Sequence, residues 1–127
     1  MKLNNDGEFL WVKGFSSYHD SQGTKLAITK NNEIYLGGFF KRNIDLNPDT
    51  TLTQIITAQQ YLFANHEGDH FLVKLSSDGD FIWGDSLSDE NNIVDFISDI
   101  KLDTDGFCYI QGRNKREGNA LFIRKIN

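Results

Sequence analysis

A ten-residue pattern occurs twice in this chain and limits its possible folds more than any other feature. The pattern Lys-Leu-x-x-Asp-Gly-x-Phe-x-Trp begins at Lys2 and again at Lys74, an offset of 72 residues. In the second copy, the alternating residues of Phe71–Leu75 predict a β-strand, and Asp78-Gly79 predicts a tight turn because glycine accepts a positive φ. A second short strand ends at Trp83, so each copy is predicted to form a β-hairpin.

Two further segments recur and show that the repeat extends beyond the hairpin. Glu33–Gly38 (EIYLGG) matches Phe107–Gly112 (FCYIQG) at an offset of 74, and Phe71–Leu75 matches Phe122–Ile126 at an offset of 51. The unequal offsets indicate a long insertion in the first unit, from Lys41 to Gly68. Each unit then has four short strands, and four-stranded units of roughly 40 to 50 residues are typical of propeller blades.

The sequence therefore predicts an all-β protein made of β-propeller-type blades, which are antiparallel four-stranded meanders, with about two blades in this chain. We expect one repeat-built domain over residues 1–127, in which 1–24 form an N-terminal strand pair and loop, 25–87 the first complete blade and 88–127 a second, incomplete blade. The expected strands are Glu8–Phe15, Lys25–Thr29, Glu33–Phe40, two within Asp69–Leu87, Phe96–Leu102, Phe107–Gly112 and Ala120–Ile126.

The segment Lys41–Asn65 is expected to be a long irregular connection. Within it, Leu52–Leu62 has apolar residues at helical spacing, but several of its residues are β-branched and it lacks a good helix cap. These features favour strand or loop over helix.

The order of the predicted strands suggests how copies of the chain could associate. The second blade lacks its fourth strand, and the N-terminal strand Glu8–Phe15 is that strand. Because two blades cannot close a ring, one hypothesis is that the N-terminal strand completes the open C-terminal blade of a neighbouring chain, in a ring of about three or four subunits. The alternative is a fragment of a longer propeller, or a truncated product, with exposed sheet edges.

The same residues resemble a known family. The run from Asp69 to Trp83 (D-x-F-x-x-K-L-x-x-D-G-x-x-x-W), the strand Ile34–Phe40 and the step Ile44–Pro48 are similar to the bacterial seven-bladed β-propeller repeat family; Asp105–Tyr109 is a looser copy. The resemblance implies blades and a secreted or cell-surface location, with mostly unassigned function. The beginning of the chain shows no signal-peptide pattern, which leaves a cytoplasmic protein, a processed segment or a piece of a longer chain as alternatives.

Composition and charge limit the classes of partner. Hydrophobic content of 39% and aromatic content of 13% argue against disorder, and no apolar run is long enough for a membrane-spanning helix. The net charge is −5, and the segment from Asp78 to Asp105 contains nine acidic residues and a single basic one, Lys101. This excess of negative charge speaks against nucleic acid or an anionic membrane as partner.

No residue set in the sequence predicts a metal, a cofactor or a catalytic site. His66-Glu67-Gly68-Asp69-His70 combines imidazoles and carboxylates, but Gly68 breaks the helical spacing of zinc sites, so a solvated loop is favoured; His19 stands apart. Asp103–Gly106 begins like a calcium loop but lacks the later oxygen ligands, so a turn is favoured. The single cysteine, Cys108, lies in a predicted strand and is expected to be buried rather than reactive.

The remaining candidates also have structural explanations. Recurrence at equivalent positions favours packing between blades for Trp11 and Trp83 over stacking on sugars. Gly37-Gly38 lacks the strand-to-helix context of a phosphate loop, and Ser86 and Ser88 lack a nucleophile elbow. The small basic loop with Arg113, Lys115 and Arg116 is expected to be solvated or to contact a partner.

The function predicted from the sequence is a non-enzymatic binding or interaction scaffold whose protein or glycan ligand meets the loops 16–23, 88–95 and 113–119. One alternative is a glycan-active or glycan-binding surface protein that uses carboxylates of Asp85–Asp99. Convergence of two of them in a concave pocket with one apolar wall would favour that alternative. Another alternative is a structural fragment without activity of its own.

Overall fold

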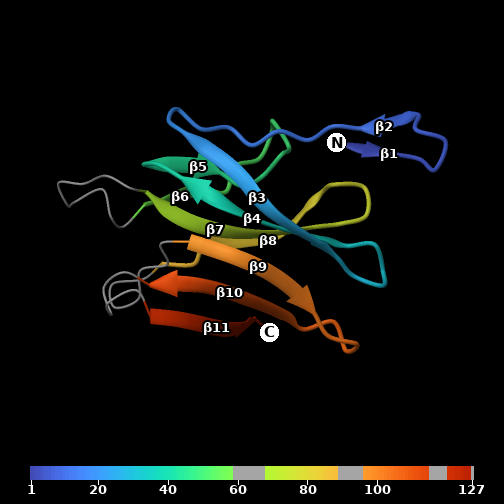
Figure 1. Cartoon of the computed structure of the whole chain (residues 1–127). Helices are drawn as coiled ribbons and strands as arrows, with labels where there is room; N and C mark the ends of the chain where they lie inside the picture. Colours follow the sequence, from blue (N-terminus) through green and yellow to red (C-terminus); the bar gives the residue numbers. More distant parts are fainter. Residues whose placement is uncertain (59–67, 89–95, 115–119, 127) are drawn as a thin grey trace.

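The computed structural model describes residues 1–58, 68–88, 96–114 and 120–126 (Figure 1). Every regular element in these ranges is a β-strand, and every strand pair is antiparallel. The predicted all-β class is therefore confirmed. No helix in the described ranges is long and apolar enough to cross a membrane.

The central element is a complete four-stranded sheet. It contains β3 (Ser21–Ile28), β4 (Ile34–Phe40), β7 (Asp69–Leu75) and β8 (Phe81–Ser86), in that spatial order. The order is the meander that the repeat predicts. Strand β3 begins within the expected loop Ser16–Gly23, so the prediction of a loop is wrong from Ser21 onward, because the ladder to β4 continues past a bulge at Thr24.

A three-stranded sheet reproduces the same plan. It contains β9 (Phe96–Leu102), β10 (Cys108–Asn114) and β11 (Ala120–Ile126), with β10 in the centre. The bulge recurs in detail: the Thr24 hydroxyl donates a 3.3 Å hydrogen bond to the Gly37 carbonyl, and the Ser98 hydroxyl donates a 3.0 Å bond to the Gln111 carbonyl. These two pairs are 74 residues apart, the offset found in the sequence.

The hairpin turns share one hydrogen-bonding scheme. In each, a side-chain oxygen accepts bonds from the backbone N–H groups two and four residues later; the accepting residues are Asn4, Thr29, Ser76 and Asp103. The residue three positions after each acceptor has a positive φ: Gly7, Asn32, Gly79 and Gly106. The turns predicted at Asp6-Gly7, Asp78-Gly79 and Asp103–Gly106 are confirmed, and glycine and asparagine suit them because both tolerate the left-handed conformation.

The predicted irregular connection after Lys41 contains a hairpin that the sequence analysis missed. Strands β5 (Asn43–Asp45) and β6 (Ile55–Thr57) pair with each other, and a carboxylate oxygen of Asp45 accepts bonds from the N–H groups of Asn47 and Gln54 at 3.0 and 2.8 Å. The preference for strand or loop over helix is confirmed for residues 52–58; residues 59–62 lie outside the described ranges.

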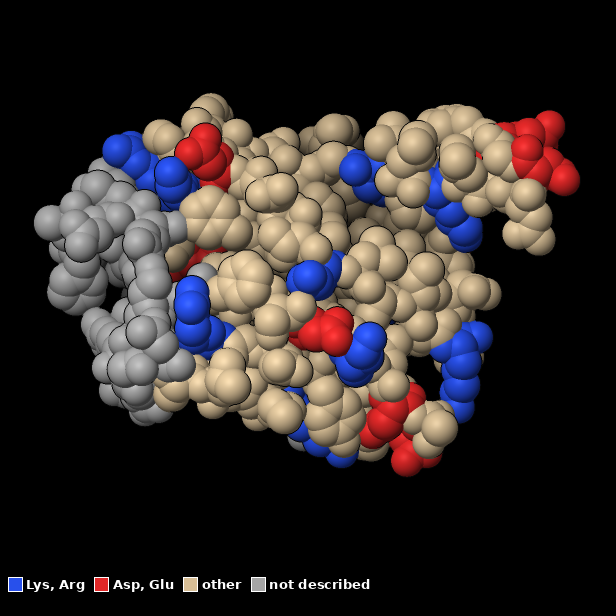
Figure 2. Space-filling model, viewed as in Figure 1, with Lys and Arg blue, Asp and Glu red and all other residues tan. Residues whose placement is uncertain are grey.

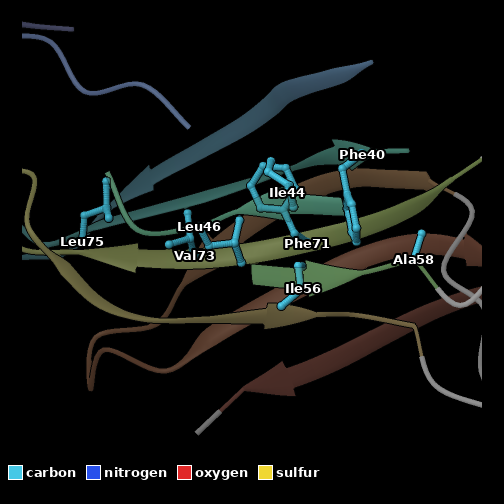
Figure 3. Packing of buried hydrophobic residues seen from close by; sticks show 8 residues of the cluster. All are labelled: Phe40, Ile44, Leu46, Ile56, Ala58, Phe71, Val73 and Leu75. Atoms are coloured by element: carbon cyan, nitrogen blue, oxygen red, sulfur yellow. The ribbon is translucent and has the colours of Figure 1, made fainter. Parts of the chain in front are cut away.

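This hairpin covers one face of the complete sheet and closes the first of two hydrophobic cores. Figure 3 shows the buried side chains of this core between β4, β7 and the β5–β6 hairpin: Phe40, Ile44, Leu46, Ile56, Ala58, Phe71, Val73 and Leu75. Phe71 also contacts the ring of Phe15, with 6.5 Å between ring centroids. The insertion therefore buries a sheet face that would otherwise be apolar and exposed.

The opposite face of the complete sheet packs against the three-stranded sheet. Its contributors there are Tyr35 and Leu72, with the half-buried Trp83 at the edge; the three-stranded sheet contributes Ile97, Ile100, Cys108 and Ile110. Tyr35 and Trp83 meet edge to face at 6.1 Å. The predicted packing role of Trp83 between two blades is therefore confirmed.

The glycine pair in β4 is explained by close packing. A Cβ at Gly38 would overlap the carbonyl oxygen of Gln22 and lie 2.6 Å from the Phe71 ring, and one at the equivalent Gly112 would meet Phe96 and Phe122 in the same way. Only a residue without a side chain fits at either position.

The N-terminal hairpin stands apart from the three-stranded sheet. Strands β1 (Lys2–Leu3) and β2 (Phe9–Trp11) pair with each other, and Figure 1 shows them on the opposite side of the molecule from β11. The strand predicted for Glu8–Phe15 is thus too long: β1 offers only two residues, which pair with Trp11 and Phe9 across a bulge, and β2 ends at Trp11.

Candidate binding surfaces

The most exposed aromatic side chain of the described chain lies in the first predicted binding loop. Tyr18 is 96% exposed and borders a hollow of about 400 Å³ that is also lined by His19, Arg42, Asn43 and Thr57. The hollow joins the loop before β3 to the β5–β6 hairpin. Of the three predicted loops, 16–23 is the one described throughout, and it contributes to a concave surface.

Several backbone contacts hold this loop in place. Phe15 anchors its beginning in the core, the Ser16 carbonyl accepts a 2.8 Å bond from the Asp45 N–H, and Ser17 forms a β-bridge with Ile44. The Ser17 hydroxyl oxygen lies 2.8 and 3.0 Å from the carbonyls of His19 and Asn43, which share its single proton. Tyr18 is therefore presented from a fixed backbone.

An ion pair closes the far end of the loop. Lys41 and Asp20 lie 2.9 Å apart, and the Lys41 N–H donates to the Asp20 carbonyl at the same distance. The hydrogen bond from Lys41 holds the pKa of the Asp20 carboxyl below its ordinary value. Both side chains are exposed, so the pair orients the loop more than it stabilises the fold.

The carboxylates of the predicted acidic segment are separated in the part that the structure describes. Asp85 borders a cavity of about 330 Å³ that contains Arg124 and the apolar residues Leu72 and Trp83, and no second described carboxylate lines it. Asp99 lies on β9, where it is 3.4 Å from Lys101. Asp89, Glu90 and Asp95 fall outside the described ranges. The described residues thus provide the apolar wall without a carboxylate pair.

The other predicted candidates take structural positions or cannot be placed. Asp69 and His70 are buried at the start of β7, while His66 and Glu67 lie outside the described ranges. Among the described residues no group of three or more His, Cys, Asp and Glu side chains could hold a metal ion. Burial raises the pKa of the Cys108 thiol to about 11, as expected for a structural cysteine.

The two remaining predicted loops are described only at their margins. Ser88 is buried and its N–H donates to the Ser86 hydroxyl at 3.2 Å, and Arg113 is exposed on β10. Residues 89–95 and 115–119, including Lys115 and Arg116, lie outside the described ranges. Figure 2 shows acidic and basic side chains interspersed on the visible face, without a broad region of one sign.

Sequence reasoning missed an apolar groove beside the N-terminal hairpin. The groove measures about 280 Å³, and its walls come from the hairpin residue Trp11 and from Leu26, Ile34 and Leu36 of the complete sheet. Leu26 is 59% exposed, and the indole N–H of Trp11 is buried without an acceptor among the described residues. The repeat offsets could have indicated this groove, because the residue equivalent to each of these four packs between the two sheets.

The fold and these surfaces define an all-β protein of antiparallel sheets that are consistent with propeller-like blades. An uncharacterized WD repeat-containing protein of Acanthamoeba polyphaga mimivirus is 25% identical to the chain over 117 residues. The aligned region covers 87% of this chain and 8% of the viral protein, so the chain spans a small part of that relative's length. No protein-family model and no solved structure matches the chain significantly.

This similarity supports a β-propeller-like repeat and hints at an interaction scaffold, because WD40 repeats build four-stranded propeller blades. It does not extend to the bacterial seven-bladed family that the sequence resembles, since the matched relative is viral. The supported class is therefore the broader one of propeller-like repeat proteins.

Proposed function

We propose that the chain is a non-enzymatic, β-propeller-type interaction module that binds a protein partner on the surface around Tyr18. The observation that carries this proposal is a large aromatic side chain, 96% exposed, on a loop that is anchored at both ends. The similarity to a WD repeat-containing protein supports the same class of function.

The chemistry of the surface favours a protein ligand. Tyrosine and arginine are enriched among residues that dominate protein–protein binding, because each offers a large contact area together with hydrogen bonding. Tyr18 and Arg42 border one hollow, and Asn43 adds amide groups beside them. Since the Ser17 hydrogen bonds already fix the backbone, binding would cost little additional ordering of the loop.

Selection with a displayed random peptide library tests the proposal. We expect enriched peptides to bind the unmodified chain and to lose about tenfold or more in affinity with Tyr18→Ala, which corresponds to the loss of a dominant contact. Leu52→Ala is the matched control, because Leu52 is also exposed but lies at the turn of the β5–β6 insertion. Peptides that bind both variants equally, or no enrichment at all, would overturn the assignment of this surface.

A glycan-binding function is the second candidate, and the cavity beside Trp83 favours it. An indole, the Asp85 carboxylate and the Arg124 guanidinium border that cavity, a combination that suits a sugar. Screening immobilised oligosaccharides distinguishes the two candidates: binding that Asp85→Asn abolishes and Tyr18→Ala leaves unchanged would favour the glycan.

A further inference from the structure

The packing between the two sheets provides a template for a second interface of the same kind, whose two halves lie on different parts of the chain. In the formed interface, Tyr35 and Leu72 of the complete sheet, with Trp83 at the edge, lie against Ile100, Cys108 and Ile110 of the three-stranded sheet, among other residues. Each of these positions has an equivalent elsewhere in the repeat, but the equivalents of Tyr35 and Leu72 are not packed against those of Ile100, Cys108 and Ile110.

One uncovered half is the groove beside the N-terminal hairpin. Leu26, Ile34 and Leu36 precede Ile100, Cys108 and Ile110 by 74 residues each, and Trp11 precedes Trp83 by 72. The groove thus contains the equivalents of the residues that the three-stranded sheet contributes to the formed interface, together with the equivalent of Trp83 from the complete sheet. What it lacks are the counterparts of Tyr35 and Leu72.

Those counterparts form the other uncovered half, on the outer face of the three-stranded sheet. They are Tyr109, which follows Tyr35 by 74 residues, and Ile123, which follows Leu72 by 51. Leu72 is fully buried whereas Ile123 is 75% exposed. The lysine beside them also recurs: the ammonium groups of Lys74 and Lys125 each lie 5.5 Å from the tyrosine ring of their own sheet.

Backbone pairing is open at the matching places. In the complete sheet, Leu72 pairs with Asp85 and Val73 with Gly84, and the Leu87 N–H donates to the His70 carbonyl at 2.8 Å. The equivalents of Gly84, Asp85 and Leu87 are Val12, Lys13 and Phe15, which belong to no strand. In the described part of the chain, β11 pairs only with β10 and leaves its other edge free.

We propose that β11 of one copy of this chain adds to the segment 12–15 of a second copy, while Tyr109 and Ile123 enter the groove beside Trp11. The repeat fixes the register: Ile123 of one copy lies opposite Lys13 of the other, as Leu72 lies opposite Asp85 within one chain. The result is a composite four-stranded blade of β9, β10, β11 and the N-terminal strand. Because the contact is head to tail, copies close into a ring, for which about three or four copies would supply six or eight blades.

Strand β1 occupies part of the place where β11 of the second copy would pair. Lys2 pairs with Trp11 as Lys74 pairs with Trp83, so β1 already occupies the place that Lys125 and Ile126 of the second copy would take. Leu121–Arg124 can add beside residues 12–15 while β1 stays in place, but full pairing requires β1 to leave. Removal of Met1–Leu3 should therefore strengthen association.

Sedimentation velocity on a dilution series tests the proposal, with the unmodified chain and the chain lacking residues 1–3. We expect concentration-dependent trimers or tetramers, formed at about tenfold lower concentration by the shortened chain. Ile123→Arg should abolish them, whereas Leu52→Arg, at another exposed apolar position outside both halves, should not. Monomers of both chains at every concentration, or association that survives Ile123→Arg, would overturn the proposal.

Cysteine cross-linking tests the register separately. A chain with Lys13→Cys, mixed with a chain carrying Ile123→Cys, should form a disulfide-linked heterodimer under mild oxidation, because residues opposite each other in a strand pair have Cβ atoms within about 5.5 Å. The native Cys108 is fully buried and stays in both chains. Equal cross-linking of Ile123→Cys to Leu52→Cys would show random collision and would contradict the proposed pairing.

Discussion

Strands β7 and β11 are copies of one element in two surroundings. Both carry the pattern Phe-x-x-Lys-(Leu or Ile), and both pair with the second strand of their unit, β4 for β7 and β10 for β11. Strand β7 has a second neighbouring strand and lies between two cores, so that nearly all of it is buried. Among the described residues, strand β11 has one neighbouring strand and one covered face, and Leu121 and Ile123 are exposed. The repeat therefore determines backbone conformation, while the neighbouring elements determine what each position contributes to stability.

The largest expected difference is between Leu72 and Ile123. Leu72→Ala should lower the free energy of unfolding by about 2 to 5 kcal/mol, because it leaves a cavity between the two sheets. Ile123→Ala in the monomeric chain should change it by less than about 0.5 kcal/mol, since the side chain is already solvated. Urea denaturation at low protein concentration measures both. Equal losses would show that β11 is covered even in the monomer and that the comparison fails.

The same contrast explains what the sequence could predict. Period-two alternation and the Asp-Gly turns depend on local backbone preferences, so the strands around Tyr35 and Tyr109 and their turns were predictable. The β5–β6 hairpin was not, because its strands have three residues each and side-chain bonds of Asp45, rather than a periodic pattern, set its turn.

The candidate surfaces were predictable only in part. The loop containing Tyr18 could be identified as polar, but its fixed shape depends on a bridge from Ser17 to Ile44, a pairing between distant segments that has no local signal. The groove beside Trp11 follows from the repeat offsets, which place Leu26, Ile34 and Leu36 at interface positions. The offsets do not show that these residues are left uncovered, since their burial depends on whether the equivalents of Tyr35 and Leu72 pack against them.

Cys108 provides a smaller difference, visible through pH. Its equivalent in the complete sheet is Ile34, and burial raises the Cys108 thiol pKa from its ordinary value near 9 to about 11. The unfolded chain therefore loses this proton first, so the thiol's contribution to stability is complete below pH 9 and declines as the pH rises toward 11. A shift of this size corresponds to a loss of about 2.7 kcal/mol once the thiol is ionised in both the folded and the unfolded chain.

Urea denaturation at several pH values between 8 and 11 measures this effect, with Cys108→Val as the matched control for the titration of lysines and tyrosines. We expect the unmodified chain to lose more stability over this range than the control does. Parallel curves would show that the thiol ionises without resistance in the folded state, and so that the interior of the three-stranded sheet is open to water.

The smallest expected effect concerns the recurring lysine. Lys74 lies 2.8 Å from the Glu33 carboxylate, and this hydrogen bond raises the Lys74 pKa. The equivalent Lys125 has no acid at that position; its ammonium lies 3.6 Å from the centre of the Phe107 ring. Glu33→Gln and Phe107→Leu should each lower the free energy of unfolding by about 0.5 to 1 kcal/mol, the first by weakening a half-buried ion pair and the second by removing a cation–π contact.

Salt distinguishes the two contacts. In about 1 M NaCl the cost of Glu33→Gln should shrink, since ions screen a pair of opposite charges, while that of Phe107→Leu should persist. Urea denaturation at low and high salt measures the difference, and an equal response of both variants would show that the two lysines are held by the same force.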